Sequence, residues 1–286
     1  MSPTDTRFTR TSPLMSAFLS CARPGRWFLA VAAVGALAGC GGGPASNISL
    51  IPGNQIEAQS RRDGLFTQPV KWEHTKPGCH GQCPSIKLDS LAFPSVQRLT
   101  QLVDHALATM TGVNPQRIPP YSTIAGYEEY FWKTAAPRDS TQLLAKARYR
   151  SKYLTVIELD TYQYFTGAAH GVSATQFLNW DNNRQTVLSL DQVLLPGQRQ
   201  AYVAALRAAH KRWLAGNPDA RRDPASYDRL WPFQPSDNFA FTDDGLVVKY
   251  DSYQIAPYSA GQPELRIPYT ELTGILKPEY LPTASH

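Results

Sequence analysis

Two stretches of the chain repeat apolar residues at the spacing of an α-helix. The first covers residues 96–111, with Ser95 as its predicted N-cap, and the second covers residues 198–214. Gly112 and Gly216 stand where these helices should end. The apolar stripes are Val96, Leu99, Val103, Ala106, Leu107 and Met110 in the first, and Tyr202, Val203, Leu206, Ala209 and Trp213 in the second. We therefore predict two amphipathic helices, each buried along its stripe.

Other stretches alternate apolar and polar positions, which is typical of strands. Residues 147–165 suit one long strand or a hairpin with both faces partly used. Residues 173–190 and 239–250 each place a turn signal, Asp-Asn-Asn and Asp-Asp-Gly, between two alternating runs, and both predict hairpins. We interpret residues 251–269 as a closing hairpin that Gly261 interrupts.

The intervals complete the predicted architecture. Residues 217–237 are rich in Pro, Asp and Arg and predict a surface loop, whereas residues 269–276 predict a last short helix. The aromatic and acidic residues 127–132 are interpreted as a solvated edge. Because hairpins dominate, we expect an α+β fold: an antiparallel β-sheet with the two long helices packed on one face.

The N-terminal residues resemble an export signal. Arg23 and Arg26 precede an apolar run that ends in Leu-Ala-Gly-Cys at Cys40, which resembles the bacterial lipobox. The run is too short for a comfortable transmembrane helix. We expect lipidation of Cys40; the alternative is an ordinary signal peptide with an incidental cysteine. Either Met1 or Met15 could be the start of translation.

The expected location is the bacterial cell envelope. Gly41, instead of aspartate, follows Cys40, and by resemblance to Gram-negative lipoproteins this favours the periplasmic face of the outer membrane. The whole chain has a formal net charge of +5, and the leader holds four arginines and one aspartate. The mature chain would therefore have a formal net charge of only about +2, which does not indicate a nucleic-acid-binding surface. Residues 40–68 begin with glycines and predict a flexible tether.

Cys79 and Cys83 flank a His-Gly-Gln tripeptide. In an oxidising periplasm two cysteines this close most simply form a disulfide that closes a tight loop. Zinc is the weaker alternative, with His74 or His80 joining the thiolates, because only two thiols are present and neighbouring residues 79 and 80 would struggle to bind one tetrahedral ion. A haem attachment would need Cys-x-x-Cys-His, which does not occur at this position.

Two motifs resemble a known family. Residues 253–261 read Tyr-Gln-Ile-Ala-Pro-Tyr-Ser-Ala-Gly, and residues 167–171 read Gly-Ala-Ala-His-Gly. They resemble signatures of the RsiV-like C-terminal domain family, a domain of unknown function met in lysozyme-sensing anti-sigma factors and in PdaC-type peptidoglycan deacetylases. Ala168 departs from the family's Gly-Gly-Ala-His-Gly pattern, which affects a turn glycine only.

The resemblance also implies a division of the chain into four parts. These are a signal peptide at residues 1–39, a tether at 40–68, the family's usual partner subdomain at 69–139 and the RsiV-like domain at 140–286. It implies a non-catalytic binding module for a lysozyme-like protein or for peptidoglycan glycan. The alternative is a peptidoglycan hydrolase or deacetylase, or an accessory to one; a purely structural envelope role is a third hypothesis.

His170 is the residue with the clearest claim to chemistry, but no Ser or Cys nucleophile motif or metal-binding motif accompanies it. We therefore interpret it as a residue that hydrogen-bonds its own turn, and we assign no catalytic residue, metal or cofactor. Loops on a rigid sheet carry function most readily. We accordingly predict a ligand surface formed by Tyr164, His170, Tyr250, Tyr253 and Tyr258.

Overall fold

The computed structural model describes residues 64–112 and 118–282, and within them the protein is α+β, as predicted. Cys40 and the predicted leader lie outside the described residues. The end of the predicted tether is part of the fold, because Phe66 is buried and the first strand begins at Gln68. No helix in the described ranges combines the length and the apolar character needed to cross a bilayer.

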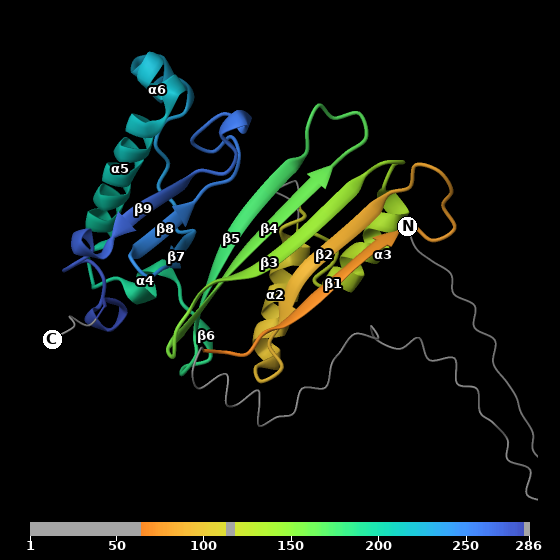
Figure 1. Ribbon diagram of the computed structural model, residues 1–286, viewed down its shortest axis with the longest axis horizontal. Coiled ribbons are helices and arrows are strands. Elements are labelled where there is room, and N and C mark those ends of the chain that lie inside the picture. Colours follow the sequence, from red (N-terminus) through yellow and green to blue (C-terminus); the bar gives the residue numbers. More distant parts are fainter. Residues whose placement is uncertain (1–63, 113–117, 283–286) are drawn as a thin grey trace, which may run out of the picture. The chain divides into compact units, whose positions relative to one another are not determined.

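The larger sheet has six strands in sequence order (Figure 1). Strands β2 and β3 pair in parallel, and every other neighbouring pair is antiparallel. The predicted boundary at residues 139 and 140 falls between these two parallel strands. Their bounds are β1 Gln68–Thr75, β2 Ser85–Ala92, β3 Ser140–Arg150, β4 Leu154–Tyr164, β5 Val172–Asp181 and β6 Thr186–Val187.

Helix α2, Gln97–Thr109, covers one face of this sheet (Figure 1) and buries Leu99, Val103 and Leu107 of the predicted stripe. The predicted cap was wrong: Val96 occupies the N-cap position and no side chain caps the helix. The nearby side chain that binds the backbone is instead Thr100, whose Oγ1 accepts from the amide of Phe93 at 2.8 Å.

Helix α3, Ile124–Thr134, lies on the same face (Figure 1) and was not predicted. Thr123 caps it by accepting a hydrogen bond from the amide of Gly126 at 3.1 Å. Tyr127 and Phe131, four residues apart, point into the core. The stretch read as a solvated edge is therefore an amphipathic helix whose apolar stripe is aromatic.

The smaller sheet consists of β7 Phe239–Phe241, β8 Gly245–Lys249 and β9 Glu264–Pro268, all antiparallel. Helix α5, Arg199–Gly216, packs against β9. A single sheet with both long helices on one face was therefore wrong: each helix has its own sheet. A four-residue helix, α4 Leu190–Val193, precedes α5.

Strands β4 and β5 contribute to two hydrophobic cores. Leu159 and Trp180 pack with α2 and α3, whereas Val156 and Phe177 pack with α5 and the smaller sheet. Both faces of these strands are thus buried, which explains why apolar residues occur at both odd and even positions in β4 and at the end of β3. Residues 147–165 form the end of β3, a turn and β4, which confirms the hairpin alternative.

Two asparagines connect β5 to the smaller sheet. Asn179 donates to the carbonyl of Phe239 at 2.7 Å and accepts from the amide of Phe241 at 3.2 Å. Asn238 accepts from the amide of Phe177 at 2.7 Å and donates to the carbonyl of Lys249 at 3.0 Å. These side chains replace strand pairing between the sheets and satisfy backbone groups that would otherwise be buried without a partner.

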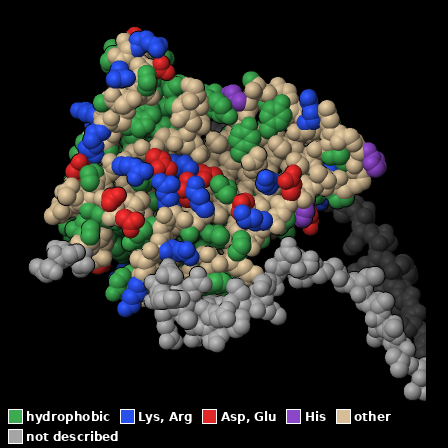
Figure 2. All heavy atoms as spheres, in the orientation of Figure 1, with side chains coloured by type: hydrophobic (Ala, Val, Ile, Leu, Met, Phe, Trp, Pro, Cys, Tyr) green, Lys and Arg blue, Asp and Glu red, His purple; other side chains and the backbone are tan. Residues whose placement is uncertain are grey.

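A group of charged side chains also bridges the sheets. Lys249 on β8 pairs with Glu158 at 2.6 Å and Asp160 at 2.7 Å, and Arg148 on β3 pairs with Glu158 at 3.3 Å and Glu264 at 2.8 Å. Figure 2 shows acidic and basic side chains intermixed near the middle of the visible face. Because Glu158 and Lys249 are buried, each depends on the other for its charge to be tolerated.

Three predictions for the C-terminal part need correction: a loop, a hairpin and a short helix. Residues 217–237 contain two short helices, α6 Pro218–Arg222 and α7 Pro224–Leu230, capped by Asn217 and Asp223. The closing hairpin pairs β9 with β8, so the region around Tyr253 is a turn instead of a strand. The predicted helix at residues 269–276 is a 3₁₀ turn at Tyr269–Glu271 followed by irregular chain.

The predicted disulfide between Cys79 and Cys83 is confirmed, with the Cα atoms 5.8 Å apart. It closes the loop between β1 and β2. His74, the alternative zinc ligand, instead places Nδ1 2.9 Å from the carboxylate of Glu128 and stacks on Trp72.

Candidate functional site

Three of the predicted ligand residues lie together at the surface. His170 comes from the connection between β4 and β5, and Tyr253 and Tyr258 come from the connection between β8 and β9. The ring of His170 stacks on Tyr258 with centroids 4.0 Å apart and lies 5.7 Å from that of Tyr253. Trp231 stacks on Tyr253 at 6.1 Å. We call these four residues the His170 cluster.

Hydrogen bonds determine which tautomer His170 adopts when it is neutral. Nδ1 lies 2.9 Å from the carbonyl oxygen of Gly171, which can only accept, so Nδ1 carries the hydrogen. Nε2 is then free to accept from the hydroxyl of Tyr253 at 2.8 Å. Both ring nitrogens are thus engaged, and the imidazole is held with one face against Tyr258. The interpretation that His170 hydrogen-bonds its own turn agrees with this geometry.

Tyr253 has an unusual backbone. Its φ is +71°, in the left-handed region that costs a residue with a side chain about 1 kcal/mol, and the residue is 49% exposed. The buried residues Ile255 and Ala256 lie two and three residues further along and anchor the turn. Exposure of a large aromatic ring on a strained backbone is a feature that stability alone does not favour.

Gly171 makes room for the cluster. A β-carbon at this position would lie 2.3 Å from Cζ of Tyr162, so a larger residue would force the ring of Tyr162 to move. The side chain of Tyr162 in turn interacts with that of Tyr258 and contributes to raising the pKa of Tyr258, after burial. The glycine after His170 therefore serves close packing against Tyr162.

Two predicted residues lie apart from the cluster. Tyr250 is fully buried, and its hydroxyl donates to the carbonyl of Gln234 at 2.7 Å; burial raises its pKa. Tyr164 is half-buried at the end of β4 and, within the described ranges, has no hydrogen bond or ring contact with the cluster. Tyr250 directly follows β8 and points into the core, whereas Tyr253 lies in the turn and is exposed.

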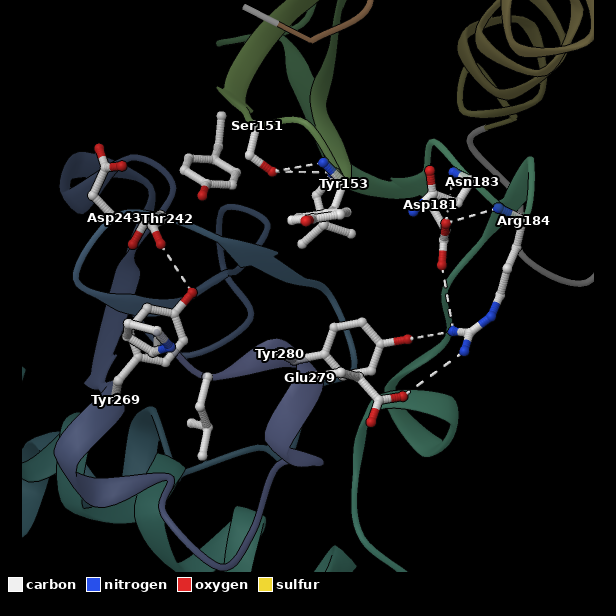
Figure 3. Close-up of a pocket in the computed structure, with 14 residues that line it drawn as sticks. Ser151, Tyr153, Asp181, Asn183, Arg184, Thr242, Asp243, Tyr269, Glu279 and Tyr280 are labelled. Atoms are coloured by element: carbon white, nitrogen blue, oxygen red, sulfur yellow. Dashed lines mark hydrogen bonds and ion pairs between the residues drawn. The ribbon is translucent and has the colours of Figure 1, made fainter. Parts of the chain in front are cut away.

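A cavity of about 880 Å³ was not predicted (Figure 3). Its walls come from four separate segments: the β3–β4 turn with the strand ends beside it, the β5–β6 turn, the β7–β8 turn and the described chain after β9. They include Tyr149, Ser151, Tyr153, Leu154, Asp181, Asn183, Arg184, Thr242, Asp243, Tyr269, Glu279, Tyr280, Leu281 and Pro282. No motif marks these residues, and their high tyrosine content is the only signal in the sequence.

Arg184 is held at one side of this cavity (Figure 3). Its guanidinium lies 3.3 Å from the carboxylate of Asp181 and 3.9 Å from that of Glu279, and it donates to the hydroxyl of Tyr280 at 3.1 Å. On the other side, Tyr269 donates to the carbonyl of Thr242 at 2.9 Å. Burial is the main cause that raises the pKa of Tyr269.

The described part of the chain contains no group of three or more His, Cys, Asp or Glu side chains that could hold a metal ion.

Comparison with known proteins places the chain in a family. Residues 191–270 match the family described as "Protein of unknown function (DUF3298)". The deacetylase PdaC of Bacillus subtilis (strain 168), named a peptidoglycan-N-acetylmuramic acid deacetylase, is 28% identical over 138 residues. That match covers 48% of this chain and only 29% of the deacetylase.

Two crystal structures of DUF3298 family proteins resemble the fold. The protein from Bacteroides fragilis NCTC 9343 is 20% identical with a TM-score of 0.56, and the match covers 76% of this chain and 95% of that one. The protein from Pseudomonas aeruginosa PAO1 is 40% identical with a TM-score of 0.70, over 77% of this chain and 98% of that one. This similarity extends over nearly the whole Pseudomonas protein and confirms the predicted RsiV-like resemblance: the chain belongs to the DUF3298 family.

Proposed function

We propose that the protein is a non-catalytic binding module of the bacterial cell envelope, and that it holds peptidoglycan glycan on the His170 cluster. The observation that carries this proposal is the exposed ring of Tyr253, presented on a left-handed backbone beside a stacked His170–Tyr258 pair. A strained, exposed aromatic residue points to a role in recognition. The PdaC relative, by its name, acts on peptidoglycan.

The chemistry of the cluster suits a sugar. Tyr and Trp offer flat apolar faces against which the C–H face of a pyranose ring can pack, while their polar ends remain able to hydrogen-bond. Ser173 and Ser252 lie beside the cluster, with their hydroxyls 3.2 Å apart, and offer further donors and acceptors. An uncharged glycan therefore finds both kinds of contact at this surface.

The hydrogen bonds of His170 support binding over catalysis. A general base needs a nitrogen free to take a proton from the reacting group, but Nδ1 donates to a carbonyl and Nε2 accepts from Tyr253. A catalytic role would require the Tyr253 bond to break. The part of the chain that resembles the deacetylase covers less than a third of it, so we assign binding, and not deacetylation, to the shared part.

We further propose that Cys40 carries a lipid and anchors the protein in the envelope. The lipobox-like Leu-Ala-Gly-Cys sequence supports this proposal. An anchored module with a glycan-binding surface would remain close to the cell wall.

The test is a calorimetric titration of the purified protein with soluble peptidoglycan glycan fragments, with hen-type lysozyme titrated in parallel. We expect saturable binding of the glycan, weakened about tenfold in Tyr253→Ala and Tyr258→Ala, since truncation of a central aromatic contact commonly costs more than 1 kcal/mol. Tyr130→Ala, which removes an exposed tyrosine on α3, is the matched control and should bind as the wild type does.

Two outcomes would contradict the proposal. Binding of lysozyme but not of glycan would make the protein a receptor for a muramidase. Release of acetate or cleavage of the glycan, abolished in His170→Ala at unchanged melting temperature, would make it an enzyme.

A further inference from the structure

We propose that the cavity in Figure 3 is a second binding site, and that it takes a basic side chain of a peptide: an ammonium or guanidinium group on an apolar stem. The cavity lining contains no residue of the His170 cluster. The proposal does not depend on glycan binding.

The walls suit the apolar stem and the charge together. Four tyrosines, with Leu154 and Leu281, surround the space: Tyr149, Tyr153, Tyr269 and Tyr280. The face of a tyrosine ring attracts a cation within about 6 Å of its centroid. A volume of about 880 Å³ is within the range of small-ligand pockets, so it can admit an extended side chain and part of its backbone.

The charge of the lining also favours a cation. It contains three carboxylates, those of Asp181, Asp243 and Glu279, against the one guanidinium of Arg184. Arg184 is already paired with Asp181 and Glu279. Asp243 has no side-chain hydrogen bond or ion pair among the described residues, which leaves its carboxylate free to pair with a ligand. An anion would instead meet two uncompensated negative charges.

Lys152 shows that the ring of Tyr153 can hold a cation. Its ammonium lies 5.6 Å from the ring centroid of Tyr153, so a cation of the chain already rests on this ring. Lys152 does not line the cavity, but its charge opposes an incoming cation. Its removal should therefore strengthen binding of the proposed ligand.

The test compares two probes that differ only in the terminal ammonium group of the side chain: Nα-acetyl-lysine methylamide and the neutral analogue Nα-acetyl-norleucine methylamide. Each is titrated into the purified protein by NMR, with the tyrosine ring signals followed. We expect the lysine probe to bind several-fold more tightly at low salt, because Tyr153 is 59% exposed and cation–π contacts at exposed sites contribute about 0.5–1 kcal/mol. Added salt should reduce this preference.

Variants locate the site. Tyr153→Ala and Asp243→Asn should weaken binding of the lysine probe several-fold, and Lys152→Met should strengthen it. Asp244→Asn is the matched control, since it removes the same charge one residue away from the lining. Tyr253→Ala should leave lysine binding unchanged while it weakens glycan binding, which separates this site from the His170 cluster.

Equal binding of the lysine and norleucine probes would overturn the proposal. So would equal effects of Asp243→Asn and Asp244→Asn, because the attraction would then be a general property of the acidic turn.

Discussion

The ammonium of Lys249 lies 2.6 Å from Oε1 of Glu158, and this contact joins strand β8 of the smaller sheet to strand β4 of the larger one. Both side chains are almost completely buried, with exposed fractions of 8% and 1%. Asp160, Arg148 and Lys146 complete the charge balance around the pair. The two sheets therefore meet through an ionic contact as well as through a hydrophobic core.

Removal of one member should be costly. Lys249→Met leaves Glu158 buried without its closest cation, and we expect the free energy of unfolding to fall by about 3 kcal/mol, as for other broken buried pairs. Urea denaturation measures this loss. Lys71→Met, which breaks the exposed pair with Asp89, is the control and should cost less than about 1 kcal/mol. Similar losses in the two variants would mean that the buried pair contributes no more than a surface contact.

Stability should also depend on pH through this pair. Burial raises the pKa of Glu158, but the hydrogen bond and charge of Lys249 outweigh it and hold the pKa below its ordinary value of 4.5. A carboxylate with a lowered pKa stabilises the fold above its unfolded pKa, and this contribution is lost as the pH falls through the folded pKa. We expect Glu158→Gln to be less stable at neutral pH and to lose less stability on acidification below 4.5.

The loss of stability at acidic pH needs a control, because burial raises the pKa of Asp251. Protonation of Asp251 therefore increases the free energy of unfolding as the pH falls, opposite to the effect of Glu158. Urea titrations at several pH values should be repeated with Asp251→Asn. An unchanged acid slope in Glu158→Gln would show that other carboxylates dominate.

Tyr253 offers a trade between stability and binding. Tyr253→Gly removes the left-handed strain, so we expect a melting temperature equal to or above that of the wild type, together with loss of glycan binding. Tyr253→Phe keeps the ring but removes the hydrogen bond to His170, and it should retain most of the affinity. A glycine variant that binds normally would exclude this ring from the site.

Gly171→Ala should disturb the His170 cluster by displacing the ring of Tyr162 that packs beneath it. The added β-carbon overlaps the ring of Tyr162, and we expect a loss of about 1–3 kcal/mol in unfolding free energy, with weaker binding at the His170 cluster. Gly216→Ala, where no atom lies within 4 Å, is the matched glycine control and should be close to neutral. Thermal melting followed by circular dichroism is sufficient for this comparison.

The lipid anchor predicts a change of compartment. Cys40→Ser removes the acceptor for the lipid, and the variant should leave the membrane fraction and enter the soluble periplasmic fraction. Fractionation with immunodetection measures this. Continued membrane association of the variant would contradict the anchor.

The elements that could be predicted from the sequence were those with a clear periodicity of apolar residues within the element itself. The apolar stripes that include Val103 and Leu206 marked α2 and α5, because every third or fourth residue faces the core. Helix α3 was missed because Tyr130 and Trp132 flank the buried Phe131, so aromatic residues occupy exposed as well as buried positions and the helical period is hidden. The second sheet was missed because alternation indicates a strand but not which sheet it joins.

The candidate sites divide in the same way. His170, Tyr253 and Tyr258 could be predicted because they lie within two local motifs, although only the fold brings those motifs together. Tyr250 lies three residues before Tyr253, and no local pattern indicates that the first points inward and the second outward. The cavity needs four segments far apart in sequence, and none of them has a distinctive spacing.

The parallel pairing of β2 with β3 has a consequence for how such proteins can evolve. A parallel pair needs a crossover, and here α2 and α3 supply it, so residues 85–150 form one interlocked strand–helix–strand unit. Recombination that replaced the segment before residue 140 would remove β2, one of the two strands that pair with β3, together with α2 and α3, and would uncover the core that these helices cover. The two segments must therefore be inherited and exchanged together.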